Sequence, residues 1–134
     1  MSDDGRGDAL PVRVRPIRGK GRGVVATRRL REGELIERAP VVVIPDRDWS
    51  IVESGVLSPF CFQWDGGDEG SAALALAHAS MCNHSYTPNA YALPRKRTRA
   101  IDFVALRDID EGEEVTINYN GDPDGDGPVG FPVR

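Results

Sequence analysis

Apolar residues along this chain occur in short runs, each bounded by glycine, proline or charged residues. Runs of this length that are rich in β-branched and aromatic residues predict β-strands. The predicted strands occupy residues 12–17, 23–30, 35–44, 58–64, 90–93, 99–109 and 115–119. A short helix is expected after Pro45, with Asp46 or Asp48 as its N-cap. The pattern therefore predicts a mainly-β domain with one or two short helices.

The most hydrophobic segment, Ala72 to Met81, departs from this pattern. It consists largely of Ala and Leu, which favour helices, so we expect a helix with Ser71 as its N-cap. A dense polar run, residues 83–89, follows it directly. Asn83 taken alone fits the end of a helix, so the pattern leaves the role of this run open.

One sequence pattern occurs twice, at residues 26–36 and again at 105–115. Each copy reads as a strand, a turn with a Glu-Gly-Glu sequence, and a second strand. Two copies so far apart do not form a repeat array. We expect two similar β-hairpin units packed within one domain.

The composition fits one globular, soluble domain: 134 residues, of which 40% are hydrophobic and 28% charged. No apolar run approaches the ~20 residues of a membrane span. The polar start of the chain is expected to be frayed and lacks the pattern of a signal peptide. Cys61 and Cys82, the two cysteines, support no disulfide framework, so a cytoplasmic location is expected.

The net charge of −4 is unevenly distributed. Residues 1–40 carry ten cationic and six acidic side chains, whereas residues 41–134 carry seven and fifteen. The basic segment 12–23 raises nucleic-acid binding as one interpretation. A solvated strand edge is favoured, because no aromatic residue stands between the arginines to stack on bases. In a third interpretation, some of these cations face an anionic group of a small cofactor.

Residues that bind metals or act as nucleophiles occur without the spacing that such sites need. Potential zinc ligands are Cys61, His78, Cys82 and His84. Cys61 has no nearby partner in the sequence, so no metal site is predicted. Residues 122–127 begin like a calcium loop, but Val133 stands where that loop needs an acidic ligand. Ser85 is directly adjacent to His84, which is poor geometry for a catalytic pair, so a hydrolase is not expected.

The remaining motifs matter through their order along the chain. They are Gly21-Arg22-Gly23-Val24, Asp48-Trp49, Asn83-His84-Ser85 with Pro88-Asn89, Gly112-Glu113-Glu114-Val115-Thr116, and Tyr119. Each is common alone, but the ordered set resembles the SET-domain lysine methyltransferases, and in particular the small stand-alone viral and bacterial members. The resemblance implies a β-clip-like fold of several small sheets. It implies a SET catalytic domain at 11–121, after a flexible N-terminus at 1–10 and before a flanking tail at 122–134.

The resemblance also assigns roles. S-adenosylmethionine would be the cofactor, with S-adenosylhomocysteine as product. Its implied binding residues are Gly21, Arg22, Gly23, Asn83, His84 and Phe131. Glycine permits close approach of the backbone to the cofactor, and Phe131 is expected to close over cofactor or substrate.

Tyr119 is the implied catalytic residue. The attacking lysine amine must be neutral, although a free lysine has a pKa of ~10.4. Desolvation beside a sulfonium would lower that pKa, and a protonated tyrosine could orient the amine. Candidate walls of the substrate channel are Phe60, Phe62 and Tyr91, together with Trp64. Plain core packing is the alternative role for each of these rings.

Two residues depart from the family pattern. Tyr86 replaces a cysteine that many members carry, and Asn118 stands where many have aspartate. No cysteine-rich tail follows, so no zinc-bound module is expected.

The expected function is S-adenosylmethionine-dependent methylation of a lysine in a protein substrate. A basic segment of that substrate is the expected site of binding. Neither a membrane nor direct nucleic-acid contact is expected, and a homodimer is left open. The alternatives are a non-catalytic module that keeps the cofactor pocket and a nucleic-acid binder. Tyr119 favours the enzyme over the first alternative, and the net acidity counts against the second.

Overall fold

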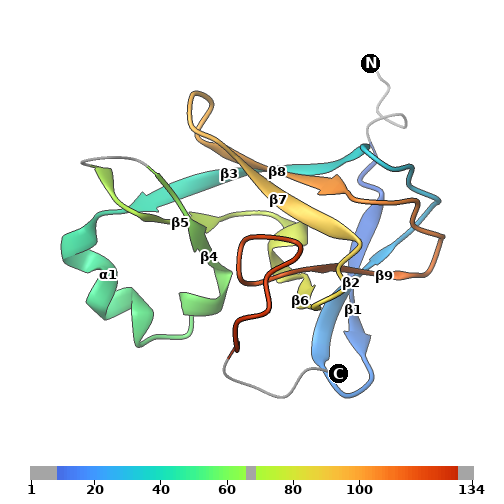
Figure 1. Cartoon of the computed structure of the whole chain (residues 1–134), viewed down its shortest axis with the longest axis horizontal. Helices are drawn as coiled ribbons and strands as arrows, with labels where there is room; N and C mark the ends of the chain where they lie inside the picture. Colours follow the sequence, from blue (N-terminus) through green and yellow to red (C-terminus); the bar gives the residue numbers. More distant parts are fainter. Residues whose placement is uncertain (1–8, 66–68, 130–134) are drawn as a thin grey trace.

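The computed structural model describes residues 9–65 and 69–129, which form two β-sheets with one α-helix at the side (Figure 1). The smaller sheet has the order β1-β2-β9-β6 and the larger one the order β4-β5-β3-β8-β7. The strands are β1 (Val12–Ile17), β2 (Gly21–Ala26), β3 (Leu35–Ile44), β4 (Cys61–Gln63), β5 (Ala72–Ala75), β6 (Asn83–His84), β7 (Ala90–Arg95), β8 (Ala100–Ala105) and β9 (Glu114–Ile117). The helices are α1 (Asp46–Glu53) and the 3₁₀ helices η2 (Ser58–Phe60) and η4 (His78–Met81). The mainly-β prediction is confirmed.

The long strand β3 organises the larger sheet. Its first half pairs with β8 and its second half with β5, both antiparallel. The core side chains beneath it include Phe103 and Ile101 of β8, both fully buried. Strands β4 and β7 form the two edges of this sheet, and both contribute to the pocket described below.

The duplicated sequence pattern forms an interlocked pair of turns rather than two hairpins. The strands of one copy pair with those of the other: β2 with β9, and β3 with β8. Leu30 and Ile109 exchange both of their backbone hydrogen bonds, at 2.8 and 2.9 Å. The turn glycines Gly33 and Gly112 have φ of 82° and 84°, and each donates a backbone hydrogen bond to the other copy. The prediction of separate hairpin units was therefore wrong, because each turn carries the chain across to the opposite copy.

The helix predicted for residues 72–81 is also wrong. Residues 72–75 form β5 between β3 and β4, and only His78–Met81 is helical, as a 3₁₀ turn. Ala73 and Ala75 are buried, with more exposed residues between them, which is the two-residue period of a strand. Pairing with strands on both sides outweighs the helix propensity of Ala and Leu.

The predicted N-caps take part in a different contact. Pro45 precedes α1 without a side-chain cap, and Asp46 is already the first helical residue. The Asp46 carboxylate instead accepts hydrogen bonds from the backbone N–H and the hydroxyl of Ser71, at 3.1 and 3.0 Å. This contact ties the start of α1 to the start of β5. Helix α1 contributes no buried residue to the core.

One buried carboxylate has a structural role on the larger sheet. Asp102 of β8 accepts two hydrogen bonds from Arg38 of β3, at 2.6 and 2.9 Å, and one from Arg95 of β7, at 3.1 Å. The Arg38 guanidinium holds the pKa of Asp102 below its usual value. The ion pairs therefore link the three strands and explain why a carboxylate can be buried at this position.

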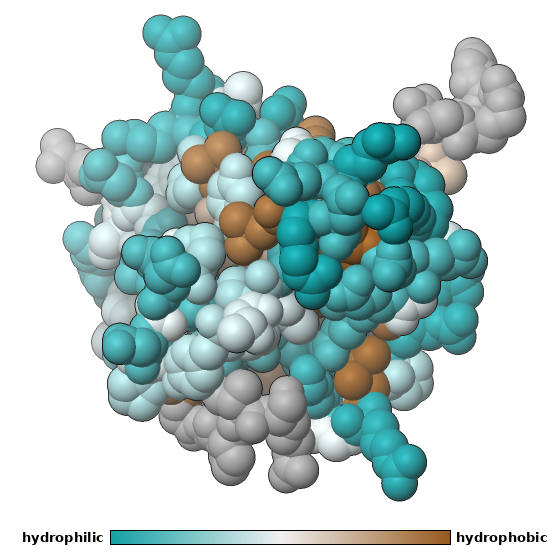
Figure 2. All heavy atoms as spheres, turned by 45° about the vertical axis from the view of Figure 1, so that its right-hand side comes forward, coloured by the Kyte–Doolittle hydropathy of each residue, from teal (hydrophilic) through white to brown (hydrophobic). Residues whose placement is uncertain are grey.

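Most of the surface seen in Figure 2 is hydrophilic, and the hydrophobic residues on that face form small separate patches. Among the described residues, no helix combines the length and the apolar character needed to cross a membrane.

Candidate active site

The polar run at residues 83–89 passes beside the last strand of the smaller sheet. Its first two residues form β6, which pairs in parallel with β9, Asn83 opposite Thr116 and His84 opposite Ile117. The backbone N–H of Ser85 then donates to the Ile117 carbonyl at 2.8 Å. The run thus lies against the end of β9, directly before Tyr119.

Asn89 fixes the far end of this run. It is buried, and its side-chain oxygen accepts a hydrogen bond from the Thr116 backbone N–H at 2.8 Å. Its amide nitrogen donates to the Glu114 carbonyl at 2.8 Å. The side chain thereby takes the place of a paired strand along β9. These bonds account for the Asn in the Pro88-Asn89 motif.

Tyr119 is held at both ends by the segment that it faces. Its hydroxyl donates to the Cys82 carbonyl at 2.7 Å, and its backbone N–H donates to His84 Nδ1 at 2.9 Å. The His84 ring also packs edge-on against the Tyr119 ring, with centroids 5.3 Å apart. Because the single hydroxyl proton is donated to Cys82, the Tyr119 oxygen can act only as an acceptor toward any other group.

Burial sets the protonation of this group. It raises the pKa of Tyr119 to about 12, with further contributions from Cys82 and Glu114, so the hydroxyl stays protonated at neutral pH. Burial lowers the pKa of His84, which keeps its ring neutral and able to accept at Nδ1. Burial raises the pKa of the Cys82 thiol, which excludes Cys82 as a thiolate nucleophile at neutral pH.

The glycine-rich turn meets Asn83 through a compact polar network. The Asn83 side chain donates to the Arg22 carbonyl at 3.1 Å and to Glu114 at 2.8 Å. Glu114 also pairs with the Lys20 ammonium at 2.9 Å. A Cβ at Gly23 would lie 2.6 Å from the Asn83 amide nitrogen, so only glycine fits there. The structure therefore brings together Gly23, Arg22 and Asn83, three of the residues that the resemblance assigns to the cofactor.

The surface beside this network fits an amino-acid-bearing cofactor. Gly21 has φ of 78°, and a Cβ there would meet nothing within 4 Å, so open space adjoins the backbone. Gly21 and Arg22 are exposed. The Lys20 ammonium and the Arg22 guanidinium supply positive charge of the kind that a carboxylate requires. These residues could therefore hold the carboxylate of a bound molecule.

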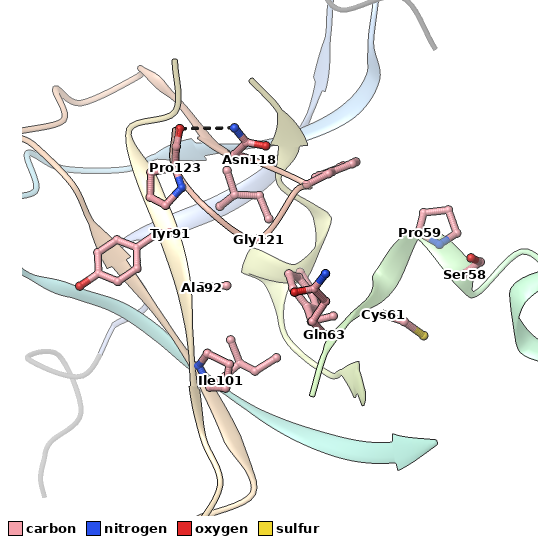
Figure 3. A pocket seen from close by; sticks show the side chains of 15 residues that line it. Ser58, Pro59, Cys61, Gln63, Tyr91, Ala92, Ile101, Asn118, Gly121 and Pro123 are labelled. Atoms are coloured by element: carbon pink, nitrogen blue, oxygen red, sulfur yellow. Dashed lines mark hydrogen bonds between the residues drawn. The ribbon is translucent and has the colours of Figure 1, made fainter. Parts of the chain in front are cut away.

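A pocket of about 290 Å³ opens on the other side of Tyr119 (Figure 3). Its walls come from β4, β7, the end of β9 and the segment after it. The lining residues include Cys61, Phe62, Gln63, Tyr91, Ile117, Asn118, Tyr119, Gly121 and Pro123. Figure 3 places Ser58, Pro59 and Cys61 on one side and Tyr91 and Pro123 on the other. Tyr119 thus lies between an apolar pocket and the Asn83–His84 segment.

Two of the predicted channel residues line this pocket and two do not. Phe62 and Tyr91 are wall residues. Phe60, within η2, is not among the lining residues, whereas its neighbours Pro59 and Cys61 are. Trp64 is buried in the core, as its alternative role required. Phe131 lies outside the described residues.

Several residues of the site escaped sequence analysis. Lys20 and Glu114 form the ion pair behind Asn83, and the Cys82 carbonyl fixes the Tyr119 hydroxyl. Glu114 belongs to the Gly-Glu-Glu motif, so the sequence could have indicated it as a site residue. A backbone carbonyl leaves no trace in the side-chain pattern, so Cys82 could not have been found. In the described part of the chain, no group of three or more His, Cys, Asp or Glu side chains is placed to hold a metal ion.

Comparisons with known proteins agree with this geometry. The family model described as "SET domain" matches residues 21–120. A Schizosaccharomyces pombe protein named histone-lysine N-methyltransferase, H3 lysine-37 specific, is 33% identical over 112 residues, which cover 81% of this chain and 73% of that protein. The crystal structure of a Plasmodium falciparum protein assigned as a histone methyltransferase aligns with a TM-score of 0.62 at 21% identity, covering 81% of this chain and 92% of that one. The order of motifs, the site that they build and these matches agree: the chain belongs to the SET-domain family.

Proposed function

We propose that this chain is an S-adenosylmethionine-dependent protein-lysine N-methyltransferase. The observation that carries the proposal is the position of Tyr119, whose hydroxyl is fixed by the Cys82 carbonyl and which lines an apolar pocket. The relative from fission yeast, which is named for histone-lysine methylation, supports the same reaction. A lysine in a protein substrate is the proposed methyl acceptor.

The pocket would favour the neutral form of the lysine amine and orient it. Phe62, Tyr91 and Ile117 give it apolar walls, and removal from water favours the neutral form of the amine. The Tyr119 oxygen accepts a hydrogen bond from the amine N–H, which turns the nitrogen lone pair away from the hydroxyl. Alignment of this kind accounts for much of the rate in a bimolecular displacement.

The opposite side of Tyr119 would hold the cofactor. S-adenosylmethionine, when bound, supplies a methyl group on a sulfonium that the amine can attack. Backbone groups of Gly21 to Gly23 and of Asn83 and His84 would bind it, while Lys20 and Arg22 would balance its carboxylate. Glu114 keeps Asn83 in place through the 2.8 Å hydrogen bond.

Cofactor binding is testable by thermal unfolding. A ligand at a hundredfold its Kd stabilises a fold by ~2.7 kcal/mol, which for a domain of this size raises Tm by on the order of 10 °C. We expect S-adenosylmethionine to produce such a shift, and Asn83→Ala to reduce it because the contact between the glycine-rich turn and β6 is lost. An unchanged Tm at millimolar cofactor, together with silent calorimetry, would refute the proposal.

The segment after β9 suits a basic substrate. Asp122, Asp124 and Asp126 are all exposed, and Pro123 between them lines the pocket. Their carboxylates would attract a basic segment around the target lysine, as in a histone tail, and salt screens such attraction over about 10 Å at 0.1 M.

Activity on a basic peptide is therefore expected to fall several-fold as ionic strength rises from about 0.05 to 0.5 M. The double variant D124N/D126N should weaken this salt dependence and raise KM for the peptide. The matched control E32Q/E111Q removes the same charge from the two glycine turns and should behave as the wild type. Equal salt dependence in all three proteins would show that the aspartates attract nothing.

A further inference from the structure

We propose that Asn118, Asn120 and Tyr86 are positioning residues that clamp the segment after β9 in place as a wall of the substrate pocket. This inference rests on the proposed function, because the wall matters for a lysine that enters the pocket. The segment, residues 121–129, is called the tail below. It contains no regular helix or strand, so contacts with the rest of the domain must determine its path.

The three side chains bind three alternate carbonyls of the tail, those of Pro123, Gly125 and Gly127. The Asn118 amide donates to the carbonyls of Pro123 and Gly125, at 3.3 and 2.8 Å. The Asn120 amide donates to the Gly127 carbonyl at 3.0 Å. The Tyr86 hydroxyl donates to that same carbonyl at 2.9 Å, from the polar run beside β9. Figure 3 shows the first of these bonds, from Asn118 to Pro123.

Burial along the tail follows the same alternation. Residues 123, 125, 127 and 129 are half-buried, whereas 122, 124, 126 and 128 are exposed. The bound carbonyls therefore belong to the residues that face the domain, and the exposed aspartates lie between them.

Glycine is required at two of the bound positions. A Cβ at Gly125 would lie 2.6 Å from the Asn120 Cβ, and a Cβ at Gly127 would lie 2.6 Å from the Asn120 side-chain oxygen. The glycines thus allow the tail to approach the clamp closely. This explains a glycine-rich sequence that was expected only to be irregular.

The clamp requires side chains that donate hydrogen bonds to the tail carbonyls. Asn118 is buried, and its side-chain oxygen accepts hydrogen bonds from the backbone and the side chain of Asn120, at 2.9 and 3.0 Å. Its side-chain nitrogen donates to the tail carbonyls. An ionised aspartate keeps the acceptor but has no donor, and it would place negative charge against two carbonyl oxygens. Tyr86 and Asn118 are the two positions at which the sequence departs from the family pattern. The departures together supply three of the four bonds to the tail.

The clamped tail completes the pocket. Gly121 and Pro123 both line it, and a Cβ at Gly121 would lie 3.2 Å from the Gln63 side-chain oxygen on β4. The tail therefore leaves β9, passes against the β4 wall and returns to the clamp. Releasing it would remove one wall from the pocket, while the bonds that Tyr119 makes to Cys82 and His84 would remain.

The test uses the full-length chain with Asn118→Asp and, separately, Tyr86→Phe. Asn118→Asp should speed amide hydrogen exchange in residues 121–129 about tenfold and raise KM for the protein substrate by a similar factor, with kcat within about twofold. Tyr86→Phe removes one bond of a shared pair, so about threefold effects in the same direction are expected. Thr98→Val is the matched control, since it removes a hydroxyl that donates to the Arg95 carbonyl in the β7–β8 turn.

Each outcome decides the proposal. Faster tail exchange with a higher KM and a nearly constant kcat supports it. Unchanged exchange in both folded variants overturns the clamp, and faster exchange without a change in KM overturns the role of the tail as a pocket wall. If Asn118→Asp fails to fold, Tyr86→Phe alone decides both points. If the wild type transfers no methyl group, the proposed function fails, while tail exchange still decides whether these side chains hold the tail.

Discussion

Replacing Tyr119 with phenylalanine should slow methyl transfer by a factor of about a hundred to a thousand, the usual cost of losing one preorganised polar group at a reacting centre. The substitution removes only the hydroxyl, which donates to the Cys82 carbonyl at 2.7 Å. In the proposed reaction its oxygen accepts a hydrogen bond from the incoming amine. The ring remains against His84, and the backbone bond to His84 Nδ1 does not depend on the hydroxyl. The measurement is single-turnover transfer of a labelled methyl group.

Cofactor affinity separates a catalytic Tyr119 from a structural one. Tyr119→Phe should bind S-adenosylmethionine nearly as well as the wild type in calorimetry. Asn83→Ala should instead lose affinity, because its side chain joins the glycine-rich turn to β9. If both variants lose binding to the same extent, Tyr119 supports the fold and the assignment is wrong.

Gly23→Ala should both destabilise the fold and abolish cofactor binding. The added Cβ would lie 2.6 Å from Asn83 Nδ2, 2.6 Å from Ile17 Cγ1 and 2.9 Å from Glu114 Oε2. Overpacking at a site this close typically costs about 1–3 kcal/mol. The side chains of Asn83, Ile17 and Glu114 must move away from the added Cβ, and moving Asn83 breaks its hydrogen bonds to Arg22 and Glu114.

Gly55→Ala is the matched control for this substitution. A Cβ there would meet nothing closer than the Val52 carbonyl at 3.6 Å, an ordinary contact. Thermal unfolding and calorimetry of both variants give the comparison. A Gly23→Ala protein with wild-type Tm and cofactor affinity would show that the close approach of β2 to β6 has no role in the site.

The strands were predictable where local pattern and tertiary pairing agree. Residues 35–44 were expected to be extended up to Pro45, and they form β3 with the same bounds. The helix predicted for residues 72–81 was wrong because Ala and Leu favour a helix, whereas residues 72–75 pair as a strand with β3 on one side and β4 on the other. The duplicated turns were recognisable, but which strands they would join depends on pairing that a single copy does not encode.

The candidate site was predictable through residues whose type is dictated by backbone geometry. Gly23 must be glycine because Asn83 occupies the space beside it, and Asn83 must be present because it bridges Arg22 and Glu114. Contacts made by backbone atoms, such as the Cys82 carbonyl on Tyr119, have no sequence signal. Asn118 was noticed only as a departure from the family pattern, and its reason emerged from the two tail carbonyls that it binds.

The central claim is that this chain methylates lysine in a protein. The most direct measurement incubates the full-length chain with isotopically labelled S-adenosylmethionine and purified histones, then locates the label by peptide mass spectrometry. The account predicts labelled methyl groups on the ε-amine of particular lysines with the wild type and almost none with Tyr119→Phe. Label confined to other residues, or equal labelling by the two proteins, would contradict it.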